Sequence, residues 1–371
     1  MKYSSFGNTG LSLSRLGFGA MRLPKKKTGE KESVDFEFAA AVMQRSFDLG
    51  VNYVDTGPGY CDDQSETAVA MALKGYDNVY LSTKNYMDDD STEKWMGKLE
   101  KSLKVLGRDH IDFYHLWAID LAAFNEKFYK KGGPMETAAR AKEQGLIKHL
   151  SFSYHGKPED IAQVIDSGLF SSMLVQYNLL DRSFEDGIRH ARSKGLGVVA
   201  MGPVGGGVLG APSPVIQSLL KEKSQSTAET ALRFVLANPN VNMALSGMNT
   251  MEMVEENVAV ASADTPLTLE ELQRVEAMMA EHKKTAELYC TACDYCKPCP
   301  QNVEIPRIFK SMNYHRVYGL TGLAKSSYRE IRNENNAGAC NDCGTCEEKC
   351  PQKIEVRRQL KECHGFLSED M

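Results

Sequence analysis

Two runs of closely spaced cysteines near the C-terminus are the residues best suited to do chemistry. They hold eight of the chain's ten cysteines, and each run ends in Cys-Pro: Cys290, Cys293, Cys296 and Cys299, then Cys340, Cys343, Cys346 and Cys350. In the second run the spacing is that of three thiolates on one iron-sulfur cubane, followed by a fourth that binds another. The first run is one residue shorter before its last cysteine. The pattern predicts two 4Fe-4S clusters.

Crossed ligation follows from this spacing. We expect Cys290, Cys293 and Cys296 to share a cluster with Cys350, and Cys340, Cys343 and Cys346 to share one with Cys299. Zinc is the main alternative, but a zinc site uses four thiolates and does not explain three overlapping Cys-x2-Cys pairs before Cys-Pro. Disulfides are disfavoured because nothing else in the chain suggests an oxidising compartment.

Length and charge set the other limits. The 371 residues, 42% of them hydrophobic, suffice for one large domain and a small one. A net charge of -5 is not the basic charge typical of a nucleic-acid-binding protein. The N-terminus has no apolar signal core, and no run of about 18 uncharged apolar residues occurs. We therefore expect a cytoplasmic protein with no membrane contact.

Short apolar runs alternate with longer amphipathic ones along the first part of the chain. Eight of the short runs read as strands: 16–20, 52–55, 79–84, 111–116, 148–153, 173–176, 197–201 and 242–246. Helix-like stretches lie between them at 35–49, 65–73, 92–106, 135–144, 159–167, 184–193 and 228–237. This alternation predicts an α/β fold, a parallel (β/α)8 barrel of the TIM type. The glycine-rich segment 202–210 after the seventh strand is expected to be a phosphate-side loop.

A domain boundary is expected after the barrel. A further helix is predicted over 270–281, and Lys283, Lys284 and Thr285 are the expected hinge. The domains would then be 1–282, the barrel, and 286–371, a small ferredoxin-like domain with two 4Fe-4S clusters.

Three side chains at the ends of barrel strands could act together. Asp55 ends the second strand, Tyr60 follows in its loop, and Lys84 ends the third. Reactive groups of such barrels lie at this rim. An isolated tyrosine titrates near pH 10, so a neighbouring cation that lowers its pKa would make it a better proton donor, and a buried lysine needs a carboxylate partner. The alternative is a salt-bridged barrel mouth without catalysis.

Residues 1–282 resemble the aldo-keto reductase family. The residues that carry the resemblance are Leu16 to Gly19, Val51 to Thr56 with Tyr60, Ser82 to Lys84, Gln176 to Asn178, and Glu256 with Asn257. The resemblance implies that Asp55, Tyr60 and Lys84 are catalytic. The family's fourth catalytic residue, a histidine, would fall at Trp117. His115 lies two residues earlier on the same face of its strand, one layer deeper. It is expected to be a hydrogen-bonded interior histidine, with a catalytic role as the alternative.

The same resemblance implies a nicotinamide nucleotide site. Ser153 and Gln176 would hold the carboxamide, Met201 would lie where many relatives stack an aromatic ring, and Glu256 and Asn257 would face the adenine. Residues 247–250 and Met253 lack the lysine and arginine with which many members bind the NADP 2'-phosphate. We therefore expect NAD(P)H with a preference for NADH.

The reductase-like barrel and the cysteine-rich domain together predict an oxidoreductase. It would reduce a carbonyl-like small molecule with NAD(P)H and exchange electrons through its clusters. Nicotinamide carries two electrons as hydride and a cluster carries one, so a flavin between them is also considered. One alternative is a flavin-bound or cluster-driven reductase without nicotinamide. Another is a non-catalytic electron-transfer subunit, which the intact Asp55, Tyr60 and Lys84 disfavour. A redox partner such as a ferredoxin is expected in addition to the substrate.

Overall fold

The structure, a computed structural model, describes residues 1–28, 31–89, 91–220, 226–263, 267–289, 296–350 and 354–369. The chain divides into two compact units. The first comprises Met1–Gly206 with Ala231–Pro266, and the second Gly207–Thr230 with Leu267–Met371.

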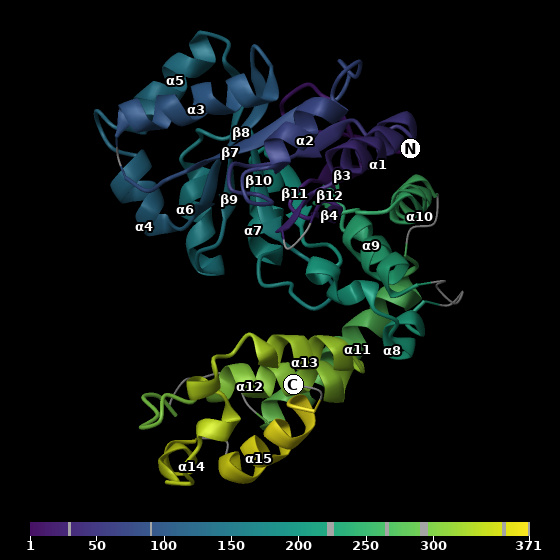
Figure 1. Ribbon diagram of the computed structural model, residues 1–371, viewed down its shortest axis with the longest axis vertical. Coiled ribbons are helices and arrows are strands. Elements are labelled where there is room, and N and C mark those ends of the chain that lie inside the picture. Colours follow the sequence, from purple (N-terminus) through teal and green to yellow (C-terminus); the bar gives the residue numbers. More distant parts are fainter. Residues whose placement is uncertain are drawn as a thin grey trace. The chain divides into compact units, whose positions relative to one another are not determined.

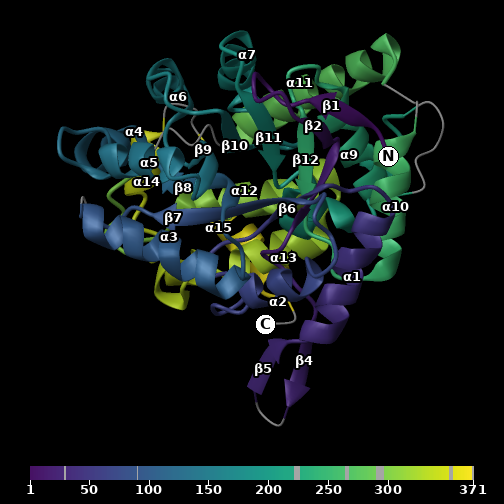
Figure 2. The ribbon, with the colours of Figure 1, turned by 90° about the horizontal axis from the view of Figure 1, so that it is seen from above.

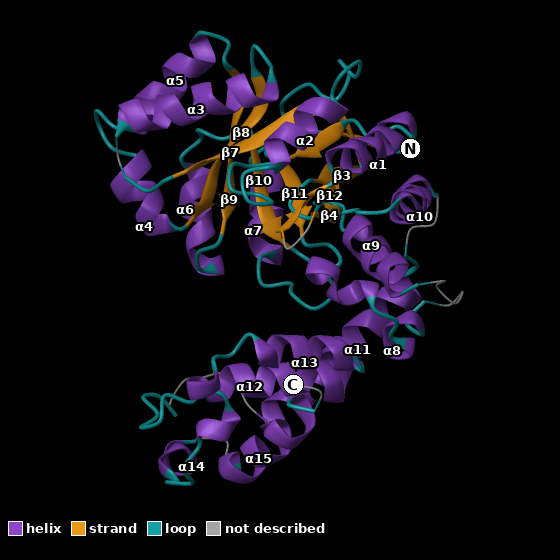
Figure 3. Cartoon of the chain, in the orientation of Figure 1, coloured by secondary structure: helices purple, strands orange, loops and turns teal. Residues whose placement is uncertain are grey.

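Eight parallel strands of the first unit close into a barrel (Figures 1 and 3). They follow one another around it in chain order, and β12 pairs with β3 to close the ring. The strands are β3 (Leu16–Gly19), β6 (Tyr53–Asp55), β7 (Tyr80–Tyr86), β8 (Ile111–Ile119), β9 (Ile147–Tyr154), β10 (Ser172–Gln176), β11 (Gly197–Met201) and β12 (Met243–Ser246). The predicted (β/α)8 barrel is therefore confirmed, and the eight apolar runs are its strands.

Helices connect these strands and surround the barrel (Figure 1). They are α1 (Phe36–Asp48), α2 (Ser65–Ala72), α3 (Thr92–Leu106), α4 (Leu121–Ala123), α5 (Pro134–Glu143), α6 (Ile161–Asp166), α7 (Glu185–Ser193), α9 (Thr227–Ala237) and α10 (Met251–Ser262). Local sequence sets their ends: the Ser91 side chain accepts a hydrogen bond from the first turn of α3, and Gly107 ends that helix at φ +62°. Sequence analysis did not predict α10 as a helix.

Two hairpins flank the barrel. The antiparallel pair β1 (Tyr3–Ser5) and β2 (Ser12–Ser14) precedes it, and the adjoining Phe6 packs edge-on against Phe113 of β8, with ring centroids 5.3 Å apart. This contact belongs to a buried cluster that also contains Tyr53, Leu174, Val199 and Met243 of four other barrel strands, so the hairpin closes that end of the barrel. The second pair, β4 (Lys25–Thr28) and β5 (Lys31–Val34), follows β3 and projects away from the barrel (Figure 2).

The described part of the second unit is helical, with no strand (Figure 3). Its helices are α8 (Pro214–Gln217), α11 (Leu269–Tyr289), α12 (Ile305–Tyr318), α13 (Thr321–Arg329), α14 (Thr345–Lys349) and α15 (Val356–Leu367). Ile308, Phe309, Tyr328 and Leu360 are central in its apolar core, and Cys346 and Cys363 are buried with them. The cysteines of this unit therefore lie against an apolar interior.

The expected hinge at residues 283–285 is wrong, because α11 continues through it to Tyr289. Charged and polar residues occur both in helices and in linkers, so composition alone did not distinguish the two here. The domain boundary between 282 and 286 stays a prediction. In the described residues no helix combines the length and apolar character needed to span a bilayer.

Candidate active site and cluster-binding site

A buried ion pair lies at the C-terminal ends of β6 and β7. Lys84 Nζ is 2.5 Å from Asp55 Oδ2, and the two residues are 1% and 3% exposed. Lys84 also donates to the Thr56 carbonyl oxygen at 2.6 Å, and the Ser82 hydroxyl donates to Asp55 Oδ1 at 2.8 Å. Sequence reasoning missed Ser82, although it lies two residues before Lys84 and so shares its face of the strand. These contacts fix the lysine in one place.

The lysine keeps its charge despite burial. Burial by itself lowers the pKa of Lys84, but Asp55 and Tyr60 raise it, and the net pKa is above the usual value. The ammonium group lies 4.8 Å from the centroid of the Tyr60 ring. The three side chains that sequence analysis singled out are therefore brought together.

Tyr60 experiences two opposing effects. Burial raises its pKa, Lys84 lowers it, and the net pKa is above 10.0. The expected influence of Lys84 is present, but it offsets only part of the desolvation. In this state Tyr60 is a protonated phenol beside a cation, which can donate a proton but is not a strong acid.

The loop that carries Tyr60 has an unusual backbone. Cys61, Asp62 and Asp63 all have left-handed φ values, of +53°, +56° and +64°. The Gly59 amide donates to Asp63 Oδ1 at 2.8 Å, and the Cys61 thiol donates to the Met21 carbonyl at 3.4 Å. These contacts hold a tight turn that directs Tyr60 toward Lys84.

Trp117 lies beside Tyr60, where the resemblance placed the family's histidine. Its ring meets those of Tyr60 and Tyr86 edge-on, at centroid distances of 5.4 and 5.6 Å. Tyr86 is its neighbour across β7 and β8 and is 54% exposed. Three aromatic rings thus form a row from the half-buried Tyr60 to the exposed Tyr86.

His115 lies deeper in the barrel, as expected, next to Lys84 in the register of β7 and β8. Its residue is 0% exposed, yet neither ring nitrogen makes a hydrogen bond of ordinary geometry. The expectation of a hydrogen-bonded interior histidine is therefore wrong in that respect. Burial, with a smaller contribution from Lys84, lowers the pKa of His115 to about 4. The ring is neutral at neutral pH because burial and Lys84 outweigh the smaller effects of Asp55 and the Phe152 backbone, which raise its pKa.

The residues expected to hold nicotinamide end three consecutive strands: Ser153 in β9, Gln176 in β10 and Met201 in β11. Gln176 and Met201 are partners in the strand register. Ser153 accepts the Ala118 amide proton at 2.7 Å, which leaves its hydroxyl proton free to donate. A Cβ at position 202 would lie 2.7 Å from the Gln176 amide, so Gly202, at φ +61°, leaves room for that side chain. This donor and acceptor set fits a carboxamide.

The two residues expected at the adenine differ in exposure. Glu256 is exposed on α10, whereas Asn257 is buried and donates to the Ser246 hydroxyl at 3.2 Å. The first turn of α10 carries Glu252, and Arg45 pairs with Glu255 at 2.8 Å. No cation of α10 therefore faces the region where NADP would carry its extra phosphate.

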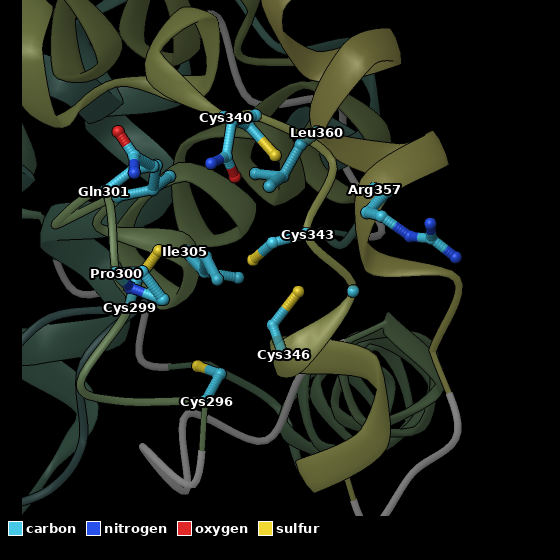
Figure 4. A pocket seen from close by; sticks show the side chains of 13 residues that line it. Cys296, Cys299, Pro300, Gln301, Ile305, Cys340, Cys343, Cys346, Arg357 and Leu360 are labelled. Carbon is cyan, nitrogen blue, oxygen red and sulfur yellow. The ribbon is translucent and has the colours of Figure 1, made fainter.

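Five cysteines line one pocket of the second unit (Figure 4). The cysteines are Cys296, Cys299, Cys340, Cys343 and Cys346, and apolar and polar neighbours complete the lining. Figure 4 shows the sulfur atoms of the last three directed into the space. Cys350 is not among the lining residues. Cys290 and Cys293 lie outside the described residues.

The spread of these thiols bears on what they bind. Across residues 296–350 and the other described segments, no three metal-binding side chains converge on a single ion position. A cubane offers four separate iron atoms to four thiolates, and five cysteines line this pocket, so its lining suits a cluster.

Comparisons with known proteins find two families along the chain. Residues 15–280 match the profile of the aldo/keto reductase family, and residues 289–355 match that of a 4Fe-4S dicluster domain. An uncharacterized oxidoreductase of Schizosaccharomyces pombe is 28% identical over 67% of this chain and 82% of its own length. L-galactose dehydrogenase of Arabidopsis thaliana is 28% identical over 74% and 93%.

A solved aldo-keto reductase of Bacillus halodurans, in its holo form, resembles the barrel. It superimposes with a TM-score of 0.63 at 26% identity, over 75% of this chain and 96% of its own.

Proposed function

The chain belongs to the aldo/keto reductase family and is an oxidoreductase of that type with a 4Fe-4S dicluster domain, and we propose that it reduces the carbonyl group of a small molecule with NAD(P)H. The observation that carries the proposal is the Lys84–Asp55 pair, 2.5 Å long and buried, with Lys84 over the Tyr60 ring. A non-catalytic subunit gives no reason for a charged lysine to be held in a buried site.

Each of the three residues has a defined task in this proposal. Tyr60 donates its phenolic proton to the carbonyl oxygen as negative charge develops there. Lys84 stabilises the phenolate that remains, and it acts in a buried site where a charge interaction is stronger than in water. Asp55, oriented by Ser82, keeps Lys84 protonated and in position.

The nicotinamide would be held by Ser153 and Gln176 through its carboxamide, with Met201 against the ring. When bound, it supplies the hydride. Glu256 and Asn257 would border the adenine, Asn257 by positioning the end of β12. Glu252 in the first turn of α10 disfavours a 2'-phosphate and supports the preference for NADH.

The two clusters would be held by the crossed sets of cysteines and would exchange single electrons with a partner such as a ferredoxin. The pocket lining supports this arrangement in part: Cys299 lies with Cys340, Cys343 and Cys346 and Cys350 does not, but Cys296, assigned to the other cluster, lines the same pocket. Since hydride transfer moves two electrons and a cluster moves one, a flavin is the proposed intermediary if the two reactions are coupled. An anaerobic spectrum with cofactor extraction tests for it.

The decisive experiment is nicotinamide oxidation with the anaerobic full-length protein and a panel of aliphatic aldehydes, aromatic aldehydes and diketones. Tyr60→Phe should lower turnover on an accepted compound by ~100-fold or more, the usual scale for loss of a general acid. Tyr129→Phe is the matched control, because Tyr129 is exposed and its ring contact with Phe124 survives the change.

Equal turnover of Tyr60→Phe and the unmodified protein would exclude the proton-donor role. Absence of nucleotide binding, together with an extractable flavin, would favour the reductase without nicotinamide.

A further inference from the structure

The cysteine pocket has a hydroxyl group at its edge. Cys343 Sγ and Thr345 Oγ1 are hydrogen-bonded at 3.5 Å. Cys343 is exposed, in contrast to the buried Cys346 that follows Thr345. In the part of the chain that the structure describes, the Thr345 hydroxyl makes no other hydrogen bond.

The backbone around this pair is firmly placed. Gly344 has φ +80° and turns the chain into α14, of which Thr345 is the first residue. Glu347 of α14 accepts hydrogen bonds from the Arg357 backbone amide at 2.9 Å and from its guanidinium at 2.9 and 2.7 Å. The turn is thereby tied to the start of α15, so Thr345 has a defined position relative to Cys343.

A helix cap does not explain the hydroxyl. The position before α14 is occupied by Gly344, which has no side chain to cap the helix, and the Thr345 hydroxyl is directed back to the sulfur rather than to a backbone amide. Its partner is therefore the cysteine expected to bind iron.

We propose that Thr345 donates a hydrogen bond to the Cys343 sulfur when that cysteine ligates a cluster, and thereby raises the cluster's reduction potential. A cysteine binds iron as the thiolate, which accepts but does not donate, so the proton must come from Thr345. Reduction adds one electron to the cluster and increases negative charge on its sulfurs. A donor at a sulfur stabilises the reduced form more than the oxidised form.

This inference rests on the proposed cluster ligation by Cys340, Cys343 and Cys346. The test is an anaerobic redox titration of the full-length protein with dithionite and mediators, followed by electron paramagnetic resonance, with iron and sulfide measured on the same samples. Thr345→Val keeps the side-chain shape and removes the donor.

At a fixed potential near the midpoint, the ratio of reduced to oxidised cluster in Thr345→Val should fall by up to ~tenfold. That is a shift of ~59 mV to more negative potential for one electron. Thr345→Ser restores the hydroxyl and should restore the midpoint. Thr321→Val makes the same change in the same unit, at a hydroxyl bonded to His315, and should leave the midpoint unchanged.

Full iron content with an unshifted midpoint in Thr345→Val would overturn the proposal, as would an equal shift in Thr321→Val. If Thr345→Val loses iron, Thr345→Ala replaces it in the comparison with Thr345→Ser. If the unmodified protein contains no iron or sulfide after reconstitution, the cluster ligation itself fails, which is distinguishable from failure of the hydrogen bond.

Discussion

At the scale of single residues, the barrel mouth combines side chains whose proton affinities are set by burial as much as by their partners. Tyr60 keeps its proton because desolvation outweighs Lys84, and Lys84 keeps its proton because Asp55 and Tyr60 together outweigh desolvation. At His115, burial and Lys84 outweigh the opposing effects of Asp55 and the Phe152 backbone, so the ring stays neutral. The site therefore holds a charged lysine beside a protonated phenol at neutral pH.

His115 should make the barrel sensitive to acid. Its pKa is about 4 when folded and near 6.5 when unfolded. The unfolded chain thus takes up this proton first as the pH falls, and the folded state loses stability between pH 6.5 and 4. At 1.36 kcal/mol per pH unit the full loss is about 3 kcal/mol. Urea unfolding at several pH values, read from tryptophan emission, should show a shallower pH dependence in His115→Gln.

Both tryptophans of the chain, Trp95 and Trp117, lie in the barrel, so this emission monitors the correct unit. His110→Gln serves as the comparison, because His110 is exposed beside Asp112. If the stability of His115→Gln depends on pH in the same way as that of the unmodified protein, His115 is not the source of the acid sensitivity.

Single side chains should also decide whether the protein prefers NADH or NADPH. Calorimetry should show NADH binding at least as tightly as NADPH, because no cation of α10 faces the expected phosphate region. Met253 is 44% exposed near the start of α10. Met253→Arg should therefore strengthen NADPH binding by ~tenfold or more, since a charged hydrogen bond contributes roughly 1.5 to 3 kcal/mol.

Met253→Gln, which is long but neutral, should not strengthen NADPH binding. A preference of about tenfold for NADPH in the unmodified chain would show that cations elsewhere bind the phosphate.

At the scale of elements, the short helix α14 depends on its neighbour. A five-residue helix is marginal by itself. Glu347 ties it to α15 through Arg357, and because those side chains are 23% and 43% exposed the pair is only weakly stabilising. Arg357→Met should loosen the segment that carries Cys346, so iron should be lost to a chelator roughly five times faster.

Arg358→Met is the matched change one residue away. Arg358 pairs with Glu355 and Glu362, outside α14, so its loss leaves that helix tied. Equal rates of iron loss in the two variants would contradict the role of the Glu347–Arg357 pair.

At the scale of the whole molecule, the second unit should carry two clusters. Anaerobic analysis should give about eight iron and eight sulfide per chain. With crossed ligation, Cys299→Ser and Cys343→Ser should perturb the same paramagnetic signal, and Cys350→Ser should perturb the other.

A colourless protein that retains zinc would exclude clusters altogether. If Cys299→Ser and Cys350→Ser perturb the same signal, the ligation is not crossed.

Much of this architecture was determined by local sequence. The eight strands were predictable because buried parallel strands are short apolar runs, and their ends carry Asp55 and Lys84 by position alone. The cysteine spacing indicated clusters because the ligands of a cubane are close together in the chain. The resemblance to the aldo-keto reductases identified the same three residues that the structure brings together.

Tertiary structure decided what depends on side chains from different elements. Three features follow from packing across strands. The His115 ring has no hydrogen bond of ordinary geometry, burial outweighs Lys84 in setting the pKa of Tyr60, and aromatic rings form a row at Trp117. The continuity of α11 through residues 283–285 was likewise not marked in the sequence. Periodicity reports which face of an element is buried, whereas hydrogen bonds and pKa values depend on distances between elements, which only the folded chain fixes.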